Sequence, residues 1–250
     1  MTASAPTPER GAPGQEEGAT SSGKPRVRRF VRENGISLGF GIAFLLALAG
    51  QAIAGWAEFN NQLTTDGLAQ IGFLSYLASS DFAVDVTENW QSEYLQFFLY
   101  IFATVWLLQR GSPESKEMHK AGTESDQDQR MGAHAGPDSP RWAGVGGMRQ
   151  AIFSRSLGLV MAALFLLSWL AQSIAGAAAY NEQQLRQLQA PISWTQYIAS
   201  ADFWSRSLQN WQSELLAVAS MAILSVYLRQ RGSPESKPVG TPHASTGTEG

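Results

Sequence analysis

The chain carries the same stretch of sequence twice. Residues 37–116 align with residues 158–237 without a gap when the sequence is shifted by 121 positions. Asn-Trp-Gln-Ser-Glu stands at 89–93 and again at 210–214. A repeat of this length indicates a tandem duplication, so the second copy should fold as the first one does.

The first apolar segment of each copy is long enough to cross a membrane. It covers Ile36–Trp56 in the first copy and Leu157–Tyr180 in the second. At 1.5 Å per residue, about 20 helical residues span a hydrocarbon core of about 30 Å. A cleaved secretory signal is the rival interpretation of the first segment, but the same segment recurs in the middle of the chain, where a signal peptide has no role.

The second segment of each copy has a shorter apolar part, Tyr94–Leu108 and Leu215–Leu228. These stretches are too short for a straight crossing, so the helix must continue back through the Asn-Trp-Gln-Ser-Glu motif. We expect the helix to begin near Asp81 or Asp202, which could serve as N-caps. Counting about 20 residues back from Gln109 places the outer membrane boundary near Asn89.

These segments predict an all-α membrane protein with four transmembrane helices, arranged as two tandem, parallel-oriented helical hairpins. Basic residues stand at the helix ends that adjoin the tails and the central linker, whereas the two connections within the copies are neutral to acidic. By the positive-inside rule, both termini and the linker are cytoplasmic and the connections lie outside. Apolar stretches in the connections, Ile71–Leu77 and Ile192–Ile198, predict short interfacial segments.

The composition divides the chain into five parts. Glycine, serine, proline and charged residues dominate the two tails and the linker, which therefore should be disordered. The parts are a cytoplasmic tail (1–25), a first membrane repeat (26–116), a linker (117–148), a second repeat (149–237) and a second tail (238–250).

The residue types exclude most enzyme classes. The chain has no cysteine, and its three histidines, His119, His134 and His243, lie in the linker and the tail. No residues of the membrane repeats therefore suit a haem, zinc or other metal site, and we expect no cofactor and no enzymatic activity. The basic residues are few and close to helix ends, which argues against binding of nucleic acid.

Polar residues inside the apolar segments are the candidate site. Gln51 and Glu93 should lie at similar depth, and Gln172 and Glu214 repeat the arrangement, so we expect a quartet near the outer leaflet. Asn89 shares a helix face with Glu93, and this polar face should point into the bundle. Asn210 repeats this arrangement, and Trp90 and Trp211 should anchor the interface.

Two functions are consistent with such a quartet. Its amides and carboxylates could fix helix packing in a non-enzymatic structural or partner-binding membrane component, which is the leading interpretation. Alternatively, Glu93 and Glu214 could share a proton in a small proton or cation channel or transporter. Ion flux that depends on the two glutamates would separate these functions.

Gln109–Lys116 recurs unchanged as Gln230–Lys237 at the end of each copy. Gly111 and Gly232 fit the position after a helix end, with proline two residues later. Helix termination does not explain identity over eight residues, so a docking segment for a cytoplasmic protein is one hypothesis. The lipid bilayer is a further expected partner, and so is a second copy of the chain, because four helices make a thin bundle.

Four segments of the first copy resemble a known family: 29–38, 50–55, 89–96 and 109–116. The family is an uncharacterised bacterial integral-membrane family, catalogued as a domain of unknown function, number 6766, and both copies resemble it. The second copy lacks the Arg-Glu-Asn-Gly lead-in of the first. The resemblance implies a location in the bacterial cell (inner) membrane and supplies no activity.

Overall fold

The computed structural model describes residues 24–248 and contains two compact units, residues 1–54 and residues 55–250. Part of the predicted N-terminal tail, residues 1–23, lies outside the described residues. The N-terminal unit holds α1 (Lys24–Glu33) and the first part of α2 (Gly35–Thr65). The second unit contains the end of α2, then α3 (Phe73–Leu77), α4 (Ser80–Trp106), two 3-10 helices (Gly132–His134 and Arg141–Ala143), α5 (Gly147–Phe153), α6 (Ser156–Arg186), α7 (Trp194–Ile198) and α8 (Ala201–Tyr227).

The described residues form helices and no strand, which confirms the predicted all-α class. Among these helices, α2 and α6 are long and apolar enough to cross a membrane. The sequence predicted four such helices, and the described chain has two. The difference arises because every stretch of 18 residues within the 27-residue helices α4 and α8 includes the polar Asn-Trp-Gln-Ser-Glu motif, which lowers its hydropathy.

The helix bounds repeat with the same period as the sequence. The second set, α6, α7 and α8, begins 121 positions after α2, α3 and α4 (156 − 35, 194 − 73 and 201 − 80). The ends differ by the same amount (186 − 65, 198 − 77 and 227 − 106). The paired helices therefore have equal lengths of 31, 5 and 27 residues.

Both α4 and α8 run through the Asn-Trp-Gln-Ser-Glu motif, as the short apolar parts required. Their N-caps are serines and not the predicted aspartates. Ser79 Oγ accepts a hydrogen bond from Phe82 N at 3.2 Å, and Ser200 Oγ accepts one from Phe203 N at 3.3 Å. The aspartates instead stand in the first turn, where a negative charge interacts favourably with the helix dipole.

The same two helices end earlier than the glycines suggested. α4 ends at Trp106 and α8 at Tyr227, and the next residue of each is extended. Gly111 and Gly232 have φ values of 86° and 85°. They therefore form turns a few residues beyond the helix and do not terminate it directly.

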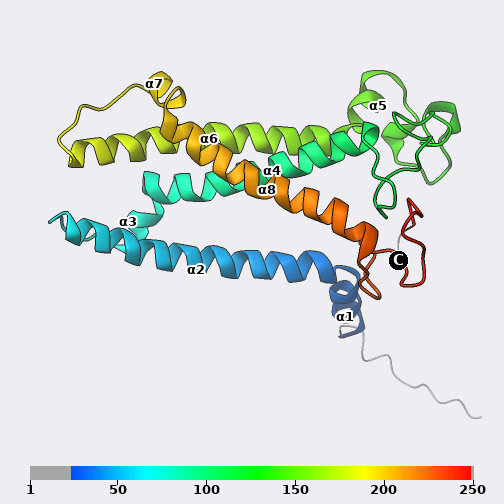
Figure 1. Cartoon of the computed structure of the whole chain (residues 1–250), viewed down its shortest axis with the longest axis horizontal. Coiled ribbons are helices and arrows are strands. Elements are labelled where there is room, and N and C mark those ends of the chain that lie inside the picture. Colours follow the sequence, from blue (N-terminus) through cyan, green and yellow to red (C-terminus); the bar gives the residue numbers. More distant parts are fainter. Residues whose placement is uncertain (1–23, 249–250) are drawn as a thin grey trace, which may run out of the picture. The chain divides into compact units, whose positions relative to one another are not determined.

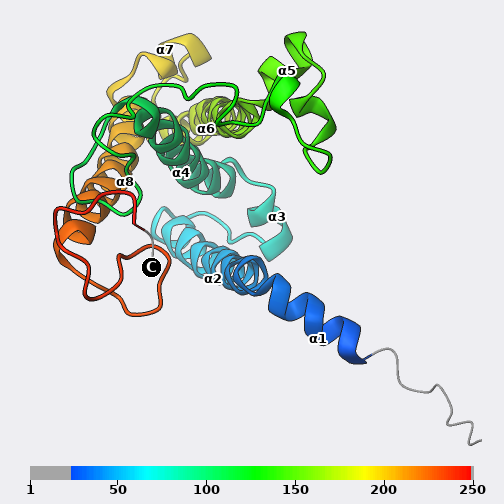
Figure 2. The ribbon, with the colours of Figure 1, turned by 90° about the vertical axis from the view of Figure 1, so that its right-hand side faces the viewer.

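Helix packing in the second unit centres on α4. This helix packs most extensively against α6 and less extensively against α8, and Figure 2 shows α4 between them. Ser80 Oγ donates to Glu182 Oε1 at 2.9 Å at one end, and Ile101 approaches Gly158 at the other, so α4 and α6 run antiparallel (Figure 1). The main interface of this unit thus joins the first copy to the second.

Large aromatic side chains join α6 to α8. The Trp169 ring in α6 lies 5.8 Å from Phe203, 5.9 Å from Trp204 and 5.5 Å from Trp211, measured between ring centroids. Residues 117–146 contain turns and the two 3-10 helices but no α-helix. The predicted disorder of the linker and of the C-terminal tail stays a prediction.

Candidate functional site

The α2–α4 and α6–α8 connections form one end of the second unit, here called the connection end. In each connection the short helix buries a tyrosine against a glycine of the preceding long helix. Tyr76 and Tyr197 are 2% and 0% exposed. A Cβ atom on Gly55 would lie 2.2 Å from Tyr76 Oη, and one on Gly176 would lie 2.4 Å from Tyr197 Oη. Any side chain larger than glycine would therefore displace the ring.

An asparagine holds each connection to its long helix. Asn60 Oδ1 accepts from Ile71 N at 2.8 Å, and its Nδ2 donates to Ile71 O at 3.0 Å. Asn181 makes the same pair of bonds to Ile192, at 2.8 and 2.9 Å. Both amide ends are satisfied, so the two connections are fixed in the same way.

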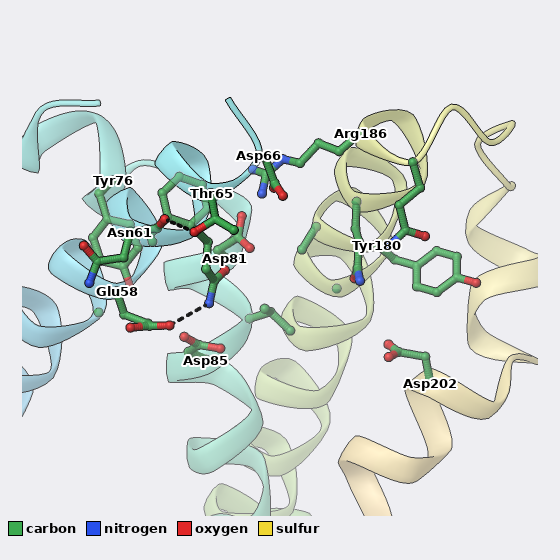
Figure 3. Close-up of a pocket in the computed structure, with 18 of the residues that line it drawn as sticks. Glu58, Asn61, Thr65, Asp66, Tyr76, Asp81, Asp85, Tyr180, Arg186 and Asp202 are labelled. Atoms are coloured by element: carbon green, nitrogen blue, oxygen red, sulfur yellow. Dashed lines mark hydrogen bonds between the residues drawn. The ribbon is translucent and has the colours of Figure 1, made fainter. Parts of the chain in front are cut away.

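A cavity of about 610 Å³ lies at the connection end (Figure 3). Its walls come from the end of α2 and from α3, α4, α6 and α8. Five carboxylates and two guanidinium groups line it, so the ionised side chains around it have a formal net charge of −3 (2 − 5). These residues are Glu58, Asp66, Asp81, Asp85, Asp202, Arg186 and Arg206.

Two cavity residues of the second copy, Asp202 and Arg206, belong to a chain of hydrogen bonds. Tyr197 Oη donates to Asp202 Oδ2 at 3.0 Å. Arg206 Nε donates to the same carboxylate oxygen at 3.3 Å, and its Nη1 donates to Glu88 Oε2 at 3.3 Å. The guanidinium group thus neutralises one carboxylate from each copy.

The first copy has no equivalent chain. The position equivalent to Arg206 is Asp85 (206 − 121), so an acid replaces the base. Asp81 Oδ2 is buried and has no hydrogen-bond partner among the described residues. The Tyr76 side chain is buried, and its hydroxyl has no hydrogen bond among the described residues, whereas the hydroxyl of its counterpart Tyr197 donates to Asp202.

Burial and charge act together on these groups. Burial raises the pKa of Asp81, the Glu182 carboxylate raises it further, and Arg186 opposes both. Burial also raises the pKa of Asp85, with Arg206 opposing. The pKa of the Tyr76 hydroxyl is raised by burial and by the two aspartates. The first copy therefore holds negative charge that the surrounding residues compensate only in part.

The predicted quartet is distributed over both units. Gln51 belongs to the N-terminal unit, and its grouping with the other three residues stays a prediction. Gln172 in α6 is fully buried, and neither polar atom of its amide has a partner among the described residues. Glu93 is exposed on α4, and Glu214 is half-buried on α8.

The other predicted residues of the motif bond mainly within the second unit's helices. Asn89 Nδ2 donates to Asp85 O at 2.7 Å, and Asn210 Nδ2 donates to Arg206 O at 3.0 Å, each one turn back. Trp90 is 40% exposed. Trp211, predicted as an interfacial anchor, packs its ring against Phe165 and Trp169 of α6.

Gln91 is the residue of the motif that the sequence analysis missed. It is fully buried on α4, and its Oε1 accepts a hydrogen bond from Trp211 Nε1 at 2.7 Å. Gln91 stands seven residues after the buried Val84 and so lies on the same helix face. This spacing was the feature of the sequence that could have indicated its burial. Its counterpart Gln212 is exposed, so the two copies use this position differently.

The repeated eight-residue segments fold into similar loops. Gln109 N donates to Ser115 Oγ, and Gln230 N donates to Ser236 Oγ, both at 2.9 Å. The final lysines differ, because Lys237 Nζ is buried among backbone carbonyls whereas Lys116 forms an ion pair with Glu124 at 3.0 Å. The shared bond gives a structural reason for the serine at this position of both segments.

Comparison with known proteins gives a match to a family model. The model of a family described as Domain of unknown function (DUF6766) matches residues 27–248, a range that includes both copies of the repeat. No curated protein and no solved structure matches the chain. Among the described residues, no group of three or more histidine, cysteine or acidic side chains is placed to hold a metal ion.

Proposed function

This chain belongs to the family described as Domain of unknown function (DUF6766), and we propose that it is a multi-pass membrane component that holds partners together and catalyses no reaction. One observation carries the proposal. The buried polar side chain of Gln91, in the first copy, accepts a hydrogen bond from Trp211 in the second and so joins helices of the two copies. In a membrane, such bonds fix which helices associate and in which register.

Four spanning helices are part of the proposal, because the lengths and surfaces of α4 and α8 suit a bilayer. A helix of 27 residues is about 40 Å long, more than a hydrocarbon core of about 30 Å. Phe102 on α4 and Leu216 and Ile223 on α8 are exposed. Lipid would cover this apolar surface, and the charged first turns before Asn89 and Asn210 would project beyond the core.

The repeated bounds support a duplicated architecture in which both copies have the same orientation. The connections would then lie outside and the termini, linker and repeated loops in the cytoplasm of a bacterial cell. Contacts between the copies would hold the bundle together. Besides the Gln91 bond, Arg206 pairs with Glu88, and Gln96 Nε2 donates to Glu214 O at 3.3 Å.

The partners in this proposal are the bilayer, a second copy of the chain, and a cytoplasmic protein at Gln109–Lys116 and Gln230–Lys237. Crosslinking in native membranes tests the latter two. A ladder of multiples of the chain mass would identify a homo-oligomer, and a distinct adduct would identify another protein. Adducts absent at both loops would contradict cytoplasmic docking there.

The packing role is tested with Gln91→Leu and its matched control Gln212→Leu in nanodiscs. An interhelical hydrogen bond in a membrane is worth about 0.6–2 kcal/mol, so Gln91→Leu should lower Tm by a few degrees. Gln212→Leu removes the exposed counterpart and should leave Tm unchanged. Equal Tm values for both variants would contradict the packing role of Gln91.

Flux in proteoliposomes tests the rival function. We expect no proton or cation flux in the wild type, and none in the Glu93→Gln/Glu214→Gln double variant. Wild-type flux that disappears in a still-folded double variant would make the protein a conductor and overturn the proposal.

A further inference from the structure

Residues of the first copy line one half of the cavity and residues of the second copy line the other, and the two halves differ in the positive charge beside their carboxylates. In the second copy, Arg206 is bonded to Asp202, which also accepts from Tyr197. The first copy presents Tyr76 and Asp81 at the equivalent positions, but Asp85 replaces the arginine. A guanidinium group is therefore bonded to the aspartate of the second copy, whereas the described residues place no bonded cation on Asp81 or Asp85.

The first-copy half contains a buried carboxylate oxygen without a partner and a tyrosine hydroxyl with no hydrogen bond among the described residues. The Tyr76 side chain is 2% exposed, lines the cavity, and its hydroxyl makes no hydrogen bond among the described residues. Asp81 Oδ2 is buried and unpaired in the described chain. Burying a carboxylate oxygen without a partner is unfavourable. A bound cation with N–H donors would satisfy both groups at once.

We propose that this cavity binds a small organic cation carrying a protonated amine. Its N–H groups would donate to the carboxylates of Asp81 and Asp85 and to the Tyr76 hydroxyl oxygen, occupying the place that the Arg206 guanidinium takes in the other half. The cavity volume of about 610 Å³ is in the range of small-molecule sites. A metal ion is a poorer occupant, because the described residues offer no cluster of three or more ligating side chains for one.

Two sources supply this chemistry. One is a free amine from solution, and the other is an ethanolamine lipid headgroup, since the connection end would lie at the membrane surface. Arg186 also lines the cavity; its guanidinium lies 5.2 Å from the centroid of the Phe59 ring and has no ion-pair partner among the described residues. It could contact the phosphate of a headgroup, whereas a free diamine would leave it unpaired.

The test is isothermal titration of the full chain in phosphatidylcholine nanodiscs with putrescine (1,4-diaminobutane). 1,4-Butanediol is the uncharged control ligand, and empty nanodiscs provide the blank. Asp85→Arg gives the first copy the residue that the second has, and should fill the site from within. Asp126→Arg makes the same change of charge on an exposed linker residue and is the matched control. Asp81→Asn provides a second disruption that introduces no bulk.

We expect putrescine to bind the wild type and Asp126→Arg equally, with 1,4-butanediol binding neither. Loss of one charge-assisted hydrogen bond should weaken binding about tenfold or more in Asp85→Arg and Asp81→Asn. If the source is a lipid, phosphatidylethanolamine in the nanodiscs should raise the Tm of the wild type but not of Asp85→Arg, and should compete with putrescine. No amine binding to folded wild type from either source, or equal binding to Asp85→Arg, would overturn the proposal. The proposal is independent of the packing role, whose test measures Gln91.

Discussion

The glycine–tyrosine contact at the connection end allows a quantitative prediction. In Gly176→Ala, the new Cβ would lie 2.4 Å from Tyr197 Oη and 3.0 Å from two carbons of the ring. The ring cannot yield easily, because it is fully buried and its hydroxyl is bonded to Asp202. Forcing extra volume into a packed site costs about 1–3 kcal/mol, and alanine returns about 1 kcal/mol of helix propensity.

Because the ring cannot yield easily, the cost should lie in the upper part of this range, about 2–3 kcal/mol, and the expected net loss is about 1–2 kcal/mol. For a chain of this size, it corresponds to a Tm decrease of about 2–8 °C. Thermal unfolding in nanodiscs, followed by tryptophan fluorescence, measures it directly.

Gly158→Ala is the matched control in the same helix. Its Cβ would meet Ile101 Cγ2 at 3.9 Å, an ordinary contact, so only the propensity gain applies and Tm should not fall. Adding Tyr197→Phe to Gly176→Ala removes the atom in closest contact, and the double variant should recover part of the lost stability. A Tm for Gly176→Ala at or above wild type, or no recovery in the double variant, would refute this account of the contact.

Three further predictions concern the same end of the bundle. Asn181→Ala removes two bonds to Ile192 and should lower Tm and speed proteolysis of residues 187–193; unchanged proteolysis would contradict the clamp. Ser200→Ala should cost about 1 kcal/mol of stability as the loss of an N-cap, whereas the exposed Ser213→Ala should not change Tm. Because the folded pKa values of Asp81 and Asp85 are raised, folding favours their protonated forms. Their contribution to folding stability is complete below the ordinary carboxyl pKa and is lost as pH rises through the raised pKa values. The charged groups that face them are Glu182, Arg186 and Arg206. Asp85→Asn should thus raise the Tm of the ligand-free protein more at neutral pH than at about pH 4, and an equal effect at both would contradict this.

Much of the helical architecture was predictable, because it depends on local pattern. The short apolar part of α4 could not cross a membrane alone, which predicted a helix through 89–93. The apolar segment beginning at Ile71 predicted a short element that the structure places at α3. The N-caps were misassigned by two residues, since Ser79 and Asp81 are both good N-cap types and local sequence does not decide between them.

The candidate site was less predictable, because it depends on which helices meet. A helical hairpin is expected to pack its two neighbouring helices together, but α4 packs mainly on α6. The buried face of α4 is therefore determined by the other copy. Gln91 becomes buried there because Trp211 supplies a donor. The cavity was missed for a related reason: Asp85 and Arg206 occupy equivalent positions in the repeat, and their opposite charges matter only where the copies meet.

The most direct test of the membrane proposal is the topology of the chain. The 250 residues contain no cysteine, so single cysteines report without background. We would introduce them at four exposed positions, Ala69→Cys, Thr123→Cys, Gln189→Cys and Ala244→Cys, and label spheroplasts with a membrane-impermeant maleimide. Four spanning helices predict labelling at positions 69 and 189 in intact spheroplasts, and at 123 and 244 only after lysis. Labelling of position 123 together with 69, and protection of 189, would mean that only α2 and α6 cross, and would contradict the proposed architecture.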